Sequence, residues 1–461
     1  MSSCGGREQV EEEVLEQIRP SRLQLRTLKL AFELIRGKLD EGLRGTGLKY
    51  QIEPEGSFAK GTLLRDRWEL DVFVIIDGVS REWVNKNGER LLLNALAPLP
   101  TVVKYSEHPY VTVSLMGLEI DVVPVVNVLE RGIEGTPLMG VERTPLHTRF
   151  VKSRLNECLA DEVRLLKSFL KGIGAYGAEA HIGGFSGYLS ELLVIHYGSF
   201  RSVIKAMASW RPPVFIDPTG SGDRGALLKR YPDSPIIVVD PVDPLRNAAA
   251  AVTLEKLSLA IVAAKLYEAG PSKEFFHAFS HRVKVDMPLP YLVAVCSGDF
   301  KGVPPADLWG RLQRLGRSLA SALSARGYEA LLASVYTNES DVASMAIMVA
   351  QAASPVRVVK GPEAWMPLDN IYSFISKRLS QGGAVFVSDR LLGVEPRSPN
   401  DLVDFAERWL SANKLYEGVT CKAWLIEEPK PPPGARVPRS WLEELYSLPA
   451  WITSLSGRRG S

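Results

Sequence analysis

The chain has 461 residues, of which 46% are hydrophobic and 23% are charged. At about 150 residues per domain this length predicts about three domains, and the composition excludes wholesale disorder. The 55 Lys and Arg against 53 Asp and Glu give a net charge of +2, so binding to a polyanion would depend on local clusters of positive charge.

The N-terminal part of the chain is predicted to alternate helices and strands. Apolar residues at helical spacing predict helices at 7–18, 23–39 and 81–96, and Pro20 separates the first two and begins the second. Runs of β-branched and apolar residues predict strands at 50–56 and 68–76 and within 102–126, with Met116-Gly117 as one corner. This part is therefore predicted to be a small α/β unit with a mixed sheet.

From about Glu142 onward the pattern becomes helical, with glycines at the ends of helices. The predicted helices are 160–177, 185–210 and 253–270, and the last two are separated by a loop at 211–225 and a strand running into a turn at 235–247. Beyond about Pro271 the prediction is strands at 291–296, 327–337 and 344–353, a helix at 306–327 and a proline-rich linker or strap at 427–439.

These elements predict an α+β multidomain protein with three parts. Residues 1–150 would form a small mixed-sheet domain, residues 151–270 a helix-rich central domain, and residues 271–461 an α/β body and tail.

The four cysteines, Cys4, Cys158, Cys296 and Cys421, form no CxxC pair and have no metal-like spacing. Neither a disulfide framework nor a zinc site is predicted, and reduced, buried thiols are expected. The acidic N-terminal segment lacks the apolar core of a signal peptide, and no apolar run is long enough to span a bilayer. We therefore expect a cytoplasmic protein with no membrane association.

Two acids interrupt the apolar strand predicted at 68–76. Glu69 and Asp71 are two residues apart, so both project from one face of the strand. Adjacent carboxylates repel each other and are costly to bury unpaired. A divalent cation such as Mg²⁺ between them would offset this cost, because it prefers oxygen ligands and bridges carboxylates to phosphates. The alternative is an exposed strand edge with two solvated acids, which is the commoner case for such a pair alone.

The loop before this strand favours the metal site. Gly56 and Ser57 allow the backbone and a hydroxyl to approach a phosphate, and Lys60 adds a positive charge. A helix predicted to begin near Phe58 would point its first amides at the same anion. A Gly-Ser pair alone is usually only a turn, but a phosphate-binding loop shortly before two same-face carboxylates is a more specific signal.

A third carboxylate is predicted from a neighbouring strand. The segment LEIDVVP carries Glu119 and Asp121 on one face of an apolar strand, and the residues alone do not choose between them. Either one completes a three-acid cluster suited to two-metal phosphoryl transfer, in which one ion activates an attacking hydroxyl and the other stabilises the leaving pyrophosphate.

The segments GSFAKGT, ELDVFV and LEIDVV together resemble the nucleotidyltransferase superfamily of DNA polymerase β. Further segments make the chain similar to the archaeal, class I CCA-adding enzymes, which are tRNA nucleotidyltransferases: EHPYV (107–111), ERTPLH (142–147), EVRLLKSFLKGIGAYGAE (162–179), GGFSGYLSELLVIHYGSF (183–200) and VVDPVDPLRNAAA (238–250). The resemblance is specific to about Ala251 and fainter to the C-terminus, where VVKGPEAW and a following helix are in the expected order.

The resemblance implies functions for the three parts and for individual residues. Residues 1–150 would be the nucleotidyltransferase catalytic head, 151–270 a neck that contacts nucleotide and tRNA, and 271–461 a tRNA-binding body and tail. It implies catalytic, metal-binding carboxylates at Glu69, Asp71 and Asp121, with Mg²⁺ as the cofactor and Glu119 as a neighbour. It implies nucleotide contacts at Ser57, Lys60, His147, Lys167, Tyr176 and Arg246.

Several of these residues have an ordinary structural alternative. An isolated histidine such as His147 is more often structural, and Lys167 could be a surface lysine whose stem lies on the helix. Tyr176 could cap the core instead of contacting nucleotide, and Arg246 could close a turn beside Asp243. Lys60 departs from the family, which usually has arginine there, so the two-pronged grip on phosphate oxygens is lost while the charge is kept.

The activity implied is addition of C, C and A to the 3′ end of tRNA from CTP and ATP, without a template and with release of pyrophosphate. The tRNA would be gripped through its acceptor and TΨC arms by basic surfaces of the C-terminal half, and a homodimer is compatible with this prediction. One alternative is a template-free adenylyltransferase of the same superfamily, such as a poly(A) polymerase or 2′-5′ oligoadenylate synthetase. Another is a decayed, RNA-binding relative, against which the three intact acids argue.

Overall fold

The computed structural model describes residues 7–105, 109–128, 138–285, 287, 289–350, 356–363, 365–387, 390–396 and 401–453. The chain divides into two compact units, Met1–His281 and Arg282–Ser461. The further division of the first unit at residue 150 stays a prediction. Cys4, the first two residues of the 107–111 motif and the end of the strand predicted at 344–353 lie outside the described residues.

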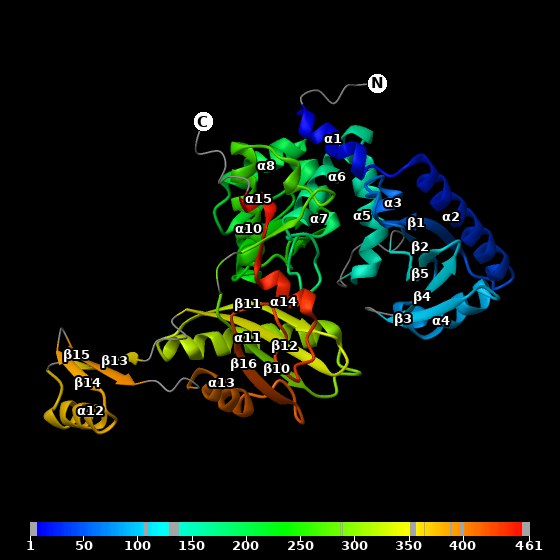
Figure 1. The fold of residues 1–461 in the computed structure, drawn as a ribbon. Helices are drawn as coiled ribbons and strands as arrows, with labels where there is room; N and C mark the ends of the chain where they lie inside the picture. Colours follow the sequence, from blue (N-terminus) through cyan, green and yellow to red (C-terminus); the bar gives the residue numbers. More distant parts are fainter. Residues whose placement is uncertain are drawn as a thin grey trace. The chain divides into compact units, whose positions relative to one another are not determined.

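A five-stranded sheet with the order β1-β2-β5-β4-β3 organises the N-terminal part of the first unit (Figure 1). Its strands are β1 (Tyr50–Glu55), β2 (Glu69–Ile76), β3 (Thr101–Tyr105), β4 (Pro109–Leu115) and β5 (Leu118–Val126). β2 and β5 run parallel and the other neighbours antiparallel, which confirms the predicted mixed sheet. The turn between β4 and β5 lies at Met116 and Gly117, both with positive φ, as predicted.

The two faces of β2 have different environments because side chains alternate along a strand. Leu70, Val72, Val74 and Ile76 are buried in a core formed with helices of the same part of the chain. The opposite face of β2 is apolar toward the C-terminal end of the strand, where Phe73 packs with other buried side chains. It is acidic at the N-terminal start of the strand. The helices of this part of the chain are α1 (Gln9–Ile18), α2 (Arg22–Leu43), α3 (Gly56–Ala59) and α4 (Arg81–Leu96), and α2 and α4 supply the buried helical side chains of the core that contains Leu70.

The start of α2 differs slightly from the prediction. Pro20 does not begin the helix. Ser21 is the N-cap, and its side chain accepts a hydrogen bond from the Gln24 backbone N–H, which is the usual role of serine at this position.

The rest of the first unit is mainly helical, as predicted. Its helices are α5 (Gly140–Arg154), α6 (Glu157–Gly172), α7 (Gly187–Tyr197), α8 (Phe200–Ser209), α9 (Arg224–Arg230), α10 (Leu254–Ala269) and the 3₁₀ turn η1 (Lys273–Phe275). A small sheet of order β6-β7-β8 joins them, built from β6 (Val214–Ile216), β7 (Ile236–Asp240) and β8 (Asp243–Asn247). The helix predicted at 185–210 is two helices, because Gly198 adopts φ +86° and ends α7.

The second unit is built on a four-stranded antiparallel sheet with the order β11-β12-β10-β16 and two helices, α11 and α13, in one core with it. The element order strand-helix-strand-strand-helix-strand with this arrangement is ferredoxin-like. Its elements are β10 (Tyr291–Ser297), α11 (Pro305–Ala325), β11 (Glu329–Thr337), β12 (Val342–Ala350), α13 (Asp401–Ala412) and β16 (Thr420–Ile426). The predicted helix and sheet of this part are confirmed.

A small module is inserted between β12 and α13 (Figure 1). It contains a three-stranded sheet and one helix, β13 (Val356–Glu363), α12 (Leu368–Ser380), β14 (Ala384–Val387) and β15 (Arg390–Pro396). The unit is completed by β9 (Arg282–Lys284), α14 (Arg439–Leu445), β17 (Ser447–Pro449) and α15 (Ala450–Thr453). Residues 427–438 contain no helix or strand, as predicted for the proline-rich segment.

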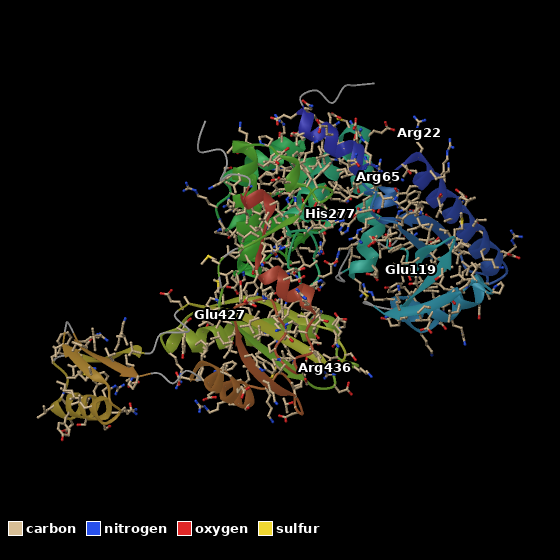
Figure 2. The ribbon with its side chains drawn as sticks, in the orientation of Figure 1. Arg22, Arg65, Glu119, His277, Glu427 and Arg436 are labelled. Carbon is tan, nitrogen blue, oxygen red and sulfur yellow. A yellow bond between two sulfur atoms is a disulfide. The ribbon has the colours of Figure 1, made fainter. Side chains whose placement is uncertain are left out.

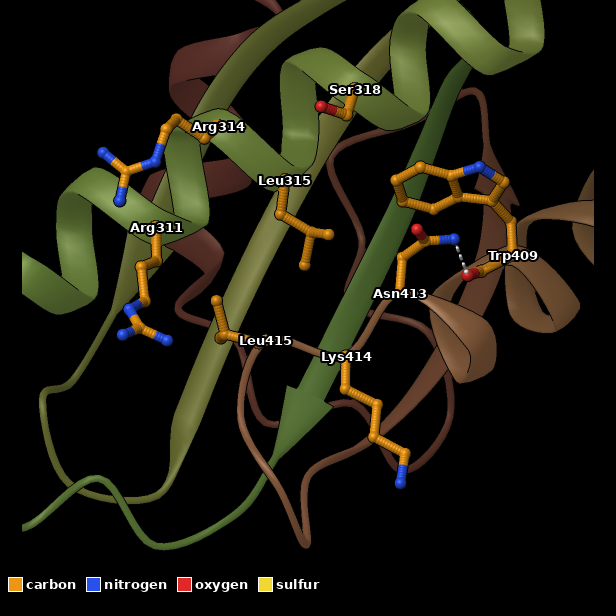
Figure 3. A pocket seen from close by; sticks show the side chains of 8 residues that line it. All are labelled: Arg311, Arg314, Leu315, Ser318, Trp409, Asn413, Lys414 and Leu415. Atoms are coloured by element: carbon orange, nitrogen blue, oxygen red, sulfur yellow. Dashed lines mark hydrogen bonds between the residues drawn. The ribbon is translucent and has the colours of Figure 1, made fainter.

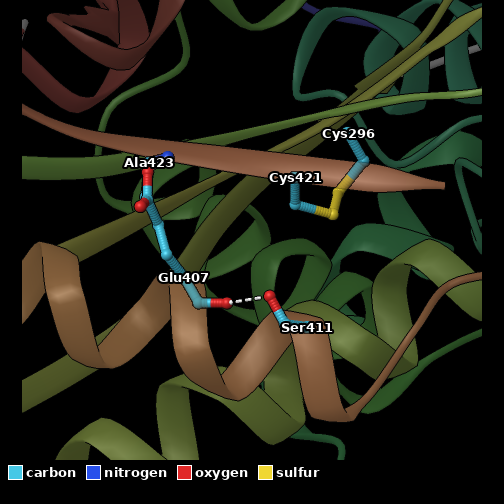
Figure 4. Close-up of a disulfide and its surroundings, with 5 residues drawn as sticks. All are labelled: Cys296, Glu407, Ser411, Cys421 and Ala423. Carbon is cyan, nitrogen blue, oxygen red and sulfur yellow. Dashed lines mark hydrogen bonds between the residues drawn. A yellow bond between two sulfur atoms is a disulfide. The ribbon is translucent and has the colours of Figure 1, made fainter.

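The prediction of reduced cysteines is wrong. Cys296 on β10 and Cys421 on β16 form a disulfide (Figure 4), and none of the three cysteines in the described residues has a free thiol. The two strands pair in a register that sets Cys296 opposite Cys421, although 125 residues separate them in sequence. Cysteine spacing along the chain could not show this contact, because it is created by strand pairing.

None of the described helices is long and apolar enough to cross a membrane.

Candidate active site

The parallel pairing of β2 and β5 brings two predicted carboxylates together. The register sets Asp71 beside Asp121. On the other side of β5, Thr112 of β4 donates a hydrogen bond of 2.6 Å from Oγ1 to Asp121 Oδ1. Asp121 is therefore the acid of β5 that adjoins Asp71, and Glu119 is the one that adjoins Glu69.

The other two acids, Glu69 and Glu119, are each paired with a basic side chain. Glu69 forms an ion pair with Arg67, and Glu119, labelled in Figure 2, forms one with Lys104 at 3.2 Å. Within the described ranges, no three His, Cys, Asp or Glu side chains lie close enough together to hold a metal ion. The structure thus brings Asp71 and Asp121 together, whereas the Glu69 carboxylate is paired with Arg67.

The charge on the inner pair fits a divalent cation. Burial, and then the negative charges of Asp121 and Glu69, raise the pKa of Asp71 to about 6. Among the residues described, no lysine or arginine forms an ion pair with Asp71 or Asp121. Two carboxylates held side by side on strands, whose mutual repulsion raises a pKa, are suitable oxygen ligands for a hard cation such as Mg²⁺.

Gly56 lets the predicted phosphate-binding loop approach this pair. It has φ +66°, and a Cβ at this position would lie 2.1 Å from Asp71 Oδ2. Only glycine combines this backbone conformation with this close approach. α3 begins at Gly56, two residues before the predicted start at Phe58, and Ser57 is its second residue.

The two predicted lysines meet at a glutamate of α7 that sequence reasoning missed. Lys60 Nζ lies 2.9 Å from Glu191 Oε2, and Lys167 Nζ lies 3.0 Å from Glu191 Oε1. Thr62 Oγ1 donates to the same carboxylate at 2.7 Å. Lys167 is therefore not the surface lysine of the alternative, since its side chain is only 3% exposed. Two ammonium groups share one carboxylate, which leaves a net positive charge beside the loop.

Replacing Glu191 by Gln is expected to lower the free energy of unfolding at pH 7 by about 3–5 kcal/mol, because it leaves two buried ammonium groups without their counterion. Burial opposes ionisation, but Lys167, Lys60 and Thr62 outweigh it and lower the pKa of Glu191 from its usual 4.5 to about 2. This stabilisation is complete above pH 4.5 and is lost as the pH falls toward 2. Denaturant unfolding at pH 7, 4 and 3 should show a weaker pH dependence in Glu191→Gln.

The exposed Glu119→Gln substitution is the control for this experiment. It removes one ion-paired glutamate from the same unit and should keep the wild-type pH dependence. Equal slopes for wild type and Glu191→Gln between pH 4.5 and 3 would show that Glu191 carries no such stabilisation.

Four of the predicted site residues line one cavity of about 380 Å³. Ser57, Glu69, Lys167 and Tyr176 face it, together with residues of the loops at 62–67 and 177–187. This volume is in the range of small-molecule sites. The Tyr176 hydroxyl would lie 3.0 Å from a Cβ at Gly187, so this glycine gives the tyrosine its space. Tyr176 is thus part of a cavity wall.

The other predicted nucleotide contacts lie around a second buried acid. His147 Nε2 is 3.0 Å from Asp240 Oδ2, and Arg246 is 2.7 Å from the same oxygen through a terminal guanidinium nitrogen. The ion-pair partner of Arg246 is thus Asp240, across the turn between β7 and β8, whereas Asp243 lies 3.9 Å from Arg143. His147 and Arg246 are brought together, although neither lines the 380 Å³ cavity.

Sequence reasoning missed Glu191 and Asp240, and each carries a recognisable signal. Glu191 is the one acid in the apolar helix segment GYLSELLVI, and Asp240 ends the apolar strand IIVVD. An acid inside an otherwise apolar element is costly to bury alone, so such a position indicates a buried cationic or hydrogen-bonding partner.

Comparison with known proteins agrees with this geometry. A nucleotidyltransferase domain matches residues 37–160, and the second domain of tRNA nucleotidyltransferase matches residues 161–277. The CCA-adding enzyme of Aeropyrum pernix is 44% identical to this chain over 98% of the chain and 97% of its own length. The chain belongs to the CCA-adding enzymes. The predicted family and nucleotidyltransferase fold are thereby confirmed.

Other CCA-adding enzymes match over shorter lengths. That of Saccharolobus shibatae is 39% identical over 70% of this chain and 74% of its own length, and that of Sulfurisphaera tokodaii is 36% identical over 80% and 84%. A solved structure of Cid1 poly(U) polymerase aligns at 14% identity with a TM-score of 0.45 over 58% of this chain and 96% of its own length. CCA-adding enzymes are nucleotidyltransferases, and nucleotidyltransferases generally use divalent metal ions.

Proposed function

We propose that this chain adds C, C and A to the 3′ end of tRNA, using CTP and ATP without a nucleic-acid template. The observation that carries the proposal is the 44% identity to a CCA-adding enzyme along nearly the whole chain. The Asp71–Asp121 pair beside the Gly56 loop is what nucleotidyl transfer requires. The template-free adenylyltransferase and the decayed RNA-binding protein find no comparable support.

In the reaction, the terminal ribose hydroxyl of tRNA attacks the α-phosphorus of the nucleotide and pyrophosphate leaves. Asp71 and Asp121 would hold Mg²⁺ from fixed strand positions, and Glu69 would complete the set by turning from Arg67. When bound, the metal ions lower the pKa of the attacking hydroxyl and neutralise charge on the leaving pyrophosphate. The strands contribute rigidity, because they fix carboxylates more closely than a loop would.

The triphosphate would be bound by the loop and by the charges around Glu191. Ser57 supplies a hydroxyl on the cavity wall, and Lys60 and Lys167 supply the net positive charge left after pairing with Glu191. Tyr176 borders the same cavity. Lys60 offers a point charge in place of a forked guanidinium, and Glu191 holds that charge in a fixed direction.

His147 and Arg246, which both contact the second buried acid, Asp240, would also contact the nucleotide. Arg246 is one-third exposed on its side chain, and its unused N–H groups can reach the incoming base or the tRNA backbone. Such donors suit selection of CTP and then ATP by hydrogen bonding to base edges.

A groove in the second unit offers a surface for the arms of tRNA. Figure 3 shows Arg311, Arg314, Leu315 and Ser318 of α11 on one side and Trp409, Asn413, Lys414 and Leu415 on the other, around a volume of about 420 Å³. None of the described residues that line it is acidic. Clustered cations beside an indole ring suit phosphates and unstacked bases of RNA, so we infer that this groove contributes to binding the acceptor and TΨC arms.

The Arg311→Gln/Arg314→Gln variant is expected to raise the Kd for tRNA about tenfold or more near 0.1 M salt and to reduce the slope of log Kd against log salt by about 1.5, as two phosphate contacts are lost. The KM for CTP should not change. Arg436→Gln/Arg439→Gln removes the same charge from the same unit, where both arginines are ion-paired. A tRNA affinity equal in the two variants would rule out the groove.

The proposed activity can be tested with tRNA that lacks its CCA end. Labelled CTP alone should extend the tRNA by two residues, and labelled ATP alone should not extend it repeatedly. Repeated addition of ATP with no use of CTP would identify an adenylyltransferase and contradict the proposal. The cytoplasm is the expected site of action, because tRNA and nucleoside triphosphates meet there. Sedimentation would determine whether the chain forms the homodimer that is compatible with this function.

A further inference from the structure

A buried acid at the end of β7 connects three elements that are far apart in the sequence. Asp240 is fully buried. Its side chain is 3.0 Å from His147 Nε2 of α5, accepts a hydrogen bond of 3.0 Å from the Tyr188 hydroxyl of α7, and is 2.7 Å from a terminal nitrogen of Arg246 on β8. The backbone N–H of Val242 donates a further hydrogen bond at 3.1 Å. The carboxylate therefore has four partners.

These contacts fix which nitrogen of His147 carries a proton. Burial raises the pKa of Asp240, but the hydrogen bonds from His147 and the Val242 N–H and the charge of Arg246 outweigh it and lower that pKa to about 2, so Asp240 is ionised. A carboxylate only accepts hydrogen bonds, so the Nε2 atom that faces it carries the hydrogen, and Nδ1 is left for another partner. The His147 ring also stacks on Tyr188, with ring centroids 3.8 Å apart. Tyr188 is itself held by Asp240, so the acid sets the ring plane as well.

The same acid fixes the direction of Arg246. A guanidinium has five N–H donors in one rigid plane. One terminal nitrogen is anchored on Asp240, and the side chain stays about one-third exposed. Anchoring one end of the plane sets where the remaining donors point.

We infer that Asp240 is a positioning residue for nucleotide selection, which holds the imidazole of His147 and the guanidinium of Arg246 in their working orientation without touching the nucleotide itself. This inference rests on the proposed function, since it assigns His147 and Arg246 to the nucleotide. Asp240 would then be the one residue that orients both of these nucleotide-contacting side chains.

The test is Asp240→Asn, which keeps the shape of the side chain and removes its charge. The KM values for CTP and ATP are expected to rise about tenfold or more, with kcat changed less than threefold, and discrimination between the two nucleotides should fall. Asp217→Asn is the matched control, because the donors to Asp217 among the hydrogen bonds described all belong to its own loop: the backbone N–H groups of Thr219, Gly220 and Gly222 and the Thr219 hydroxyl. It should keep wild-type kinetics.

A second measurement does not depend on activity. The pKa of His147 is lowered by burial and by the charges of Lys60 and Arg246, and raised by Asp240. An NMR titration, assigned with His147→Gln, should therefore give a lower pKa for His147 in Asp240→Asn than in the wild type. This readout stands even if the protein transfers other nucleotides, so it separates failure of the inference from failure of the proposed function.

Two results would overturn the inference. One is a folded Asp240→Asn enzyme with wild-type KM values. The other is a raised KM with an unchanged His147 titration, which would show a general structural effect. If Asp240→Asn does not fold, Tyr188→Phe decides, because it removes one of the four contacts and leaves the charge. It should raise the KM values by a smaller factor, and wild-type KM values in that variant would count against the inference.

Discussion

Replacing Asp71 by Ala is expected to reduce nucleotide addition by about 1000-fold or more while tRNA binding survives. Asp71 lies beside Asp121 on the parallel strands β2 and β5, and the pair is the centre of the proposed metal site. Loss of one ligand removes several kcal/mol of transition-state stabilisation, and each ~1.4 kcal/mol is tenfold in rate. Single-turnover addition of CTP to tRNA lacking CCA measures the rate, and a filter-binding assay measures tRNA affinity.

Glu119→Gln is the matched control for Asp71→Ala. Glu119 is two register positions away on the neighbouring strand, but its side chain is 74% exposed and pairs with Lys104. It should keep a rate within a few-fold of the wild type. An Asp71→Ala enzyme with unchanged activity would contradict the metal assignment.

Gly56→Ala is expected to reduce activity by about 100-fold or more. The added methyl group would lie 2.1 Å from Asp71 Oδ2, so either the carboxylate or the loop must move. A displacement of about 1 Å at a reacting centre can cost about 100-fold in rate. The substitution also places alanine at φ +66°, which costs about 1–2 kcal/mol of stability. Steady-state kinetics and thermal unfolding of the variant measure the two effects.

Gly78→Ala separates these two effects. Gly78 has φ +71°, and a Cβ there would meet no atom within 4 Å. Its stability loss should match that of Gly56→Ala, but its activity should stay near the wild-type value. If both variants lose activity equally, backbone strain explains the loss, and the close approach of Gly56 to Asp71 does not.

The catalytic strands were predictable because their chemistry is local. Alternation in ELDVFVII places Glu69 and Asp71 on one face, and the structure confirms the strand. That Asp121, and not Glu119, adjoins Asp71 depends on the parallel register of β2 and β5, which two separate strand sequences do not contain. Strand periodicity likewise could not predict the ion pair between Glu69 and Arg67.

The parts that were missed depend on contacts between distant segments. Glu191 is buried with Lys60, 131 residues away, and Asp240 with His147, 93 residues away. The disulfide between Cys296 and Cys421 depends on the pairing of β10 with β16. α5 was also missed as an element, because it contains Pro145 and few apolar residues. In each case tertiary packing decides a feature that local patterns leave open.

The most direct test of the central proposal is the sequence of tRNA 3′ ends after reaction with all four nucleoside triphosphates and Mg²⁺. Starting from tRNA without its CCA end, the proposal predicts products that end in CCA and grow no further. Products extended by a run of A, or by no C at all, would contradict it.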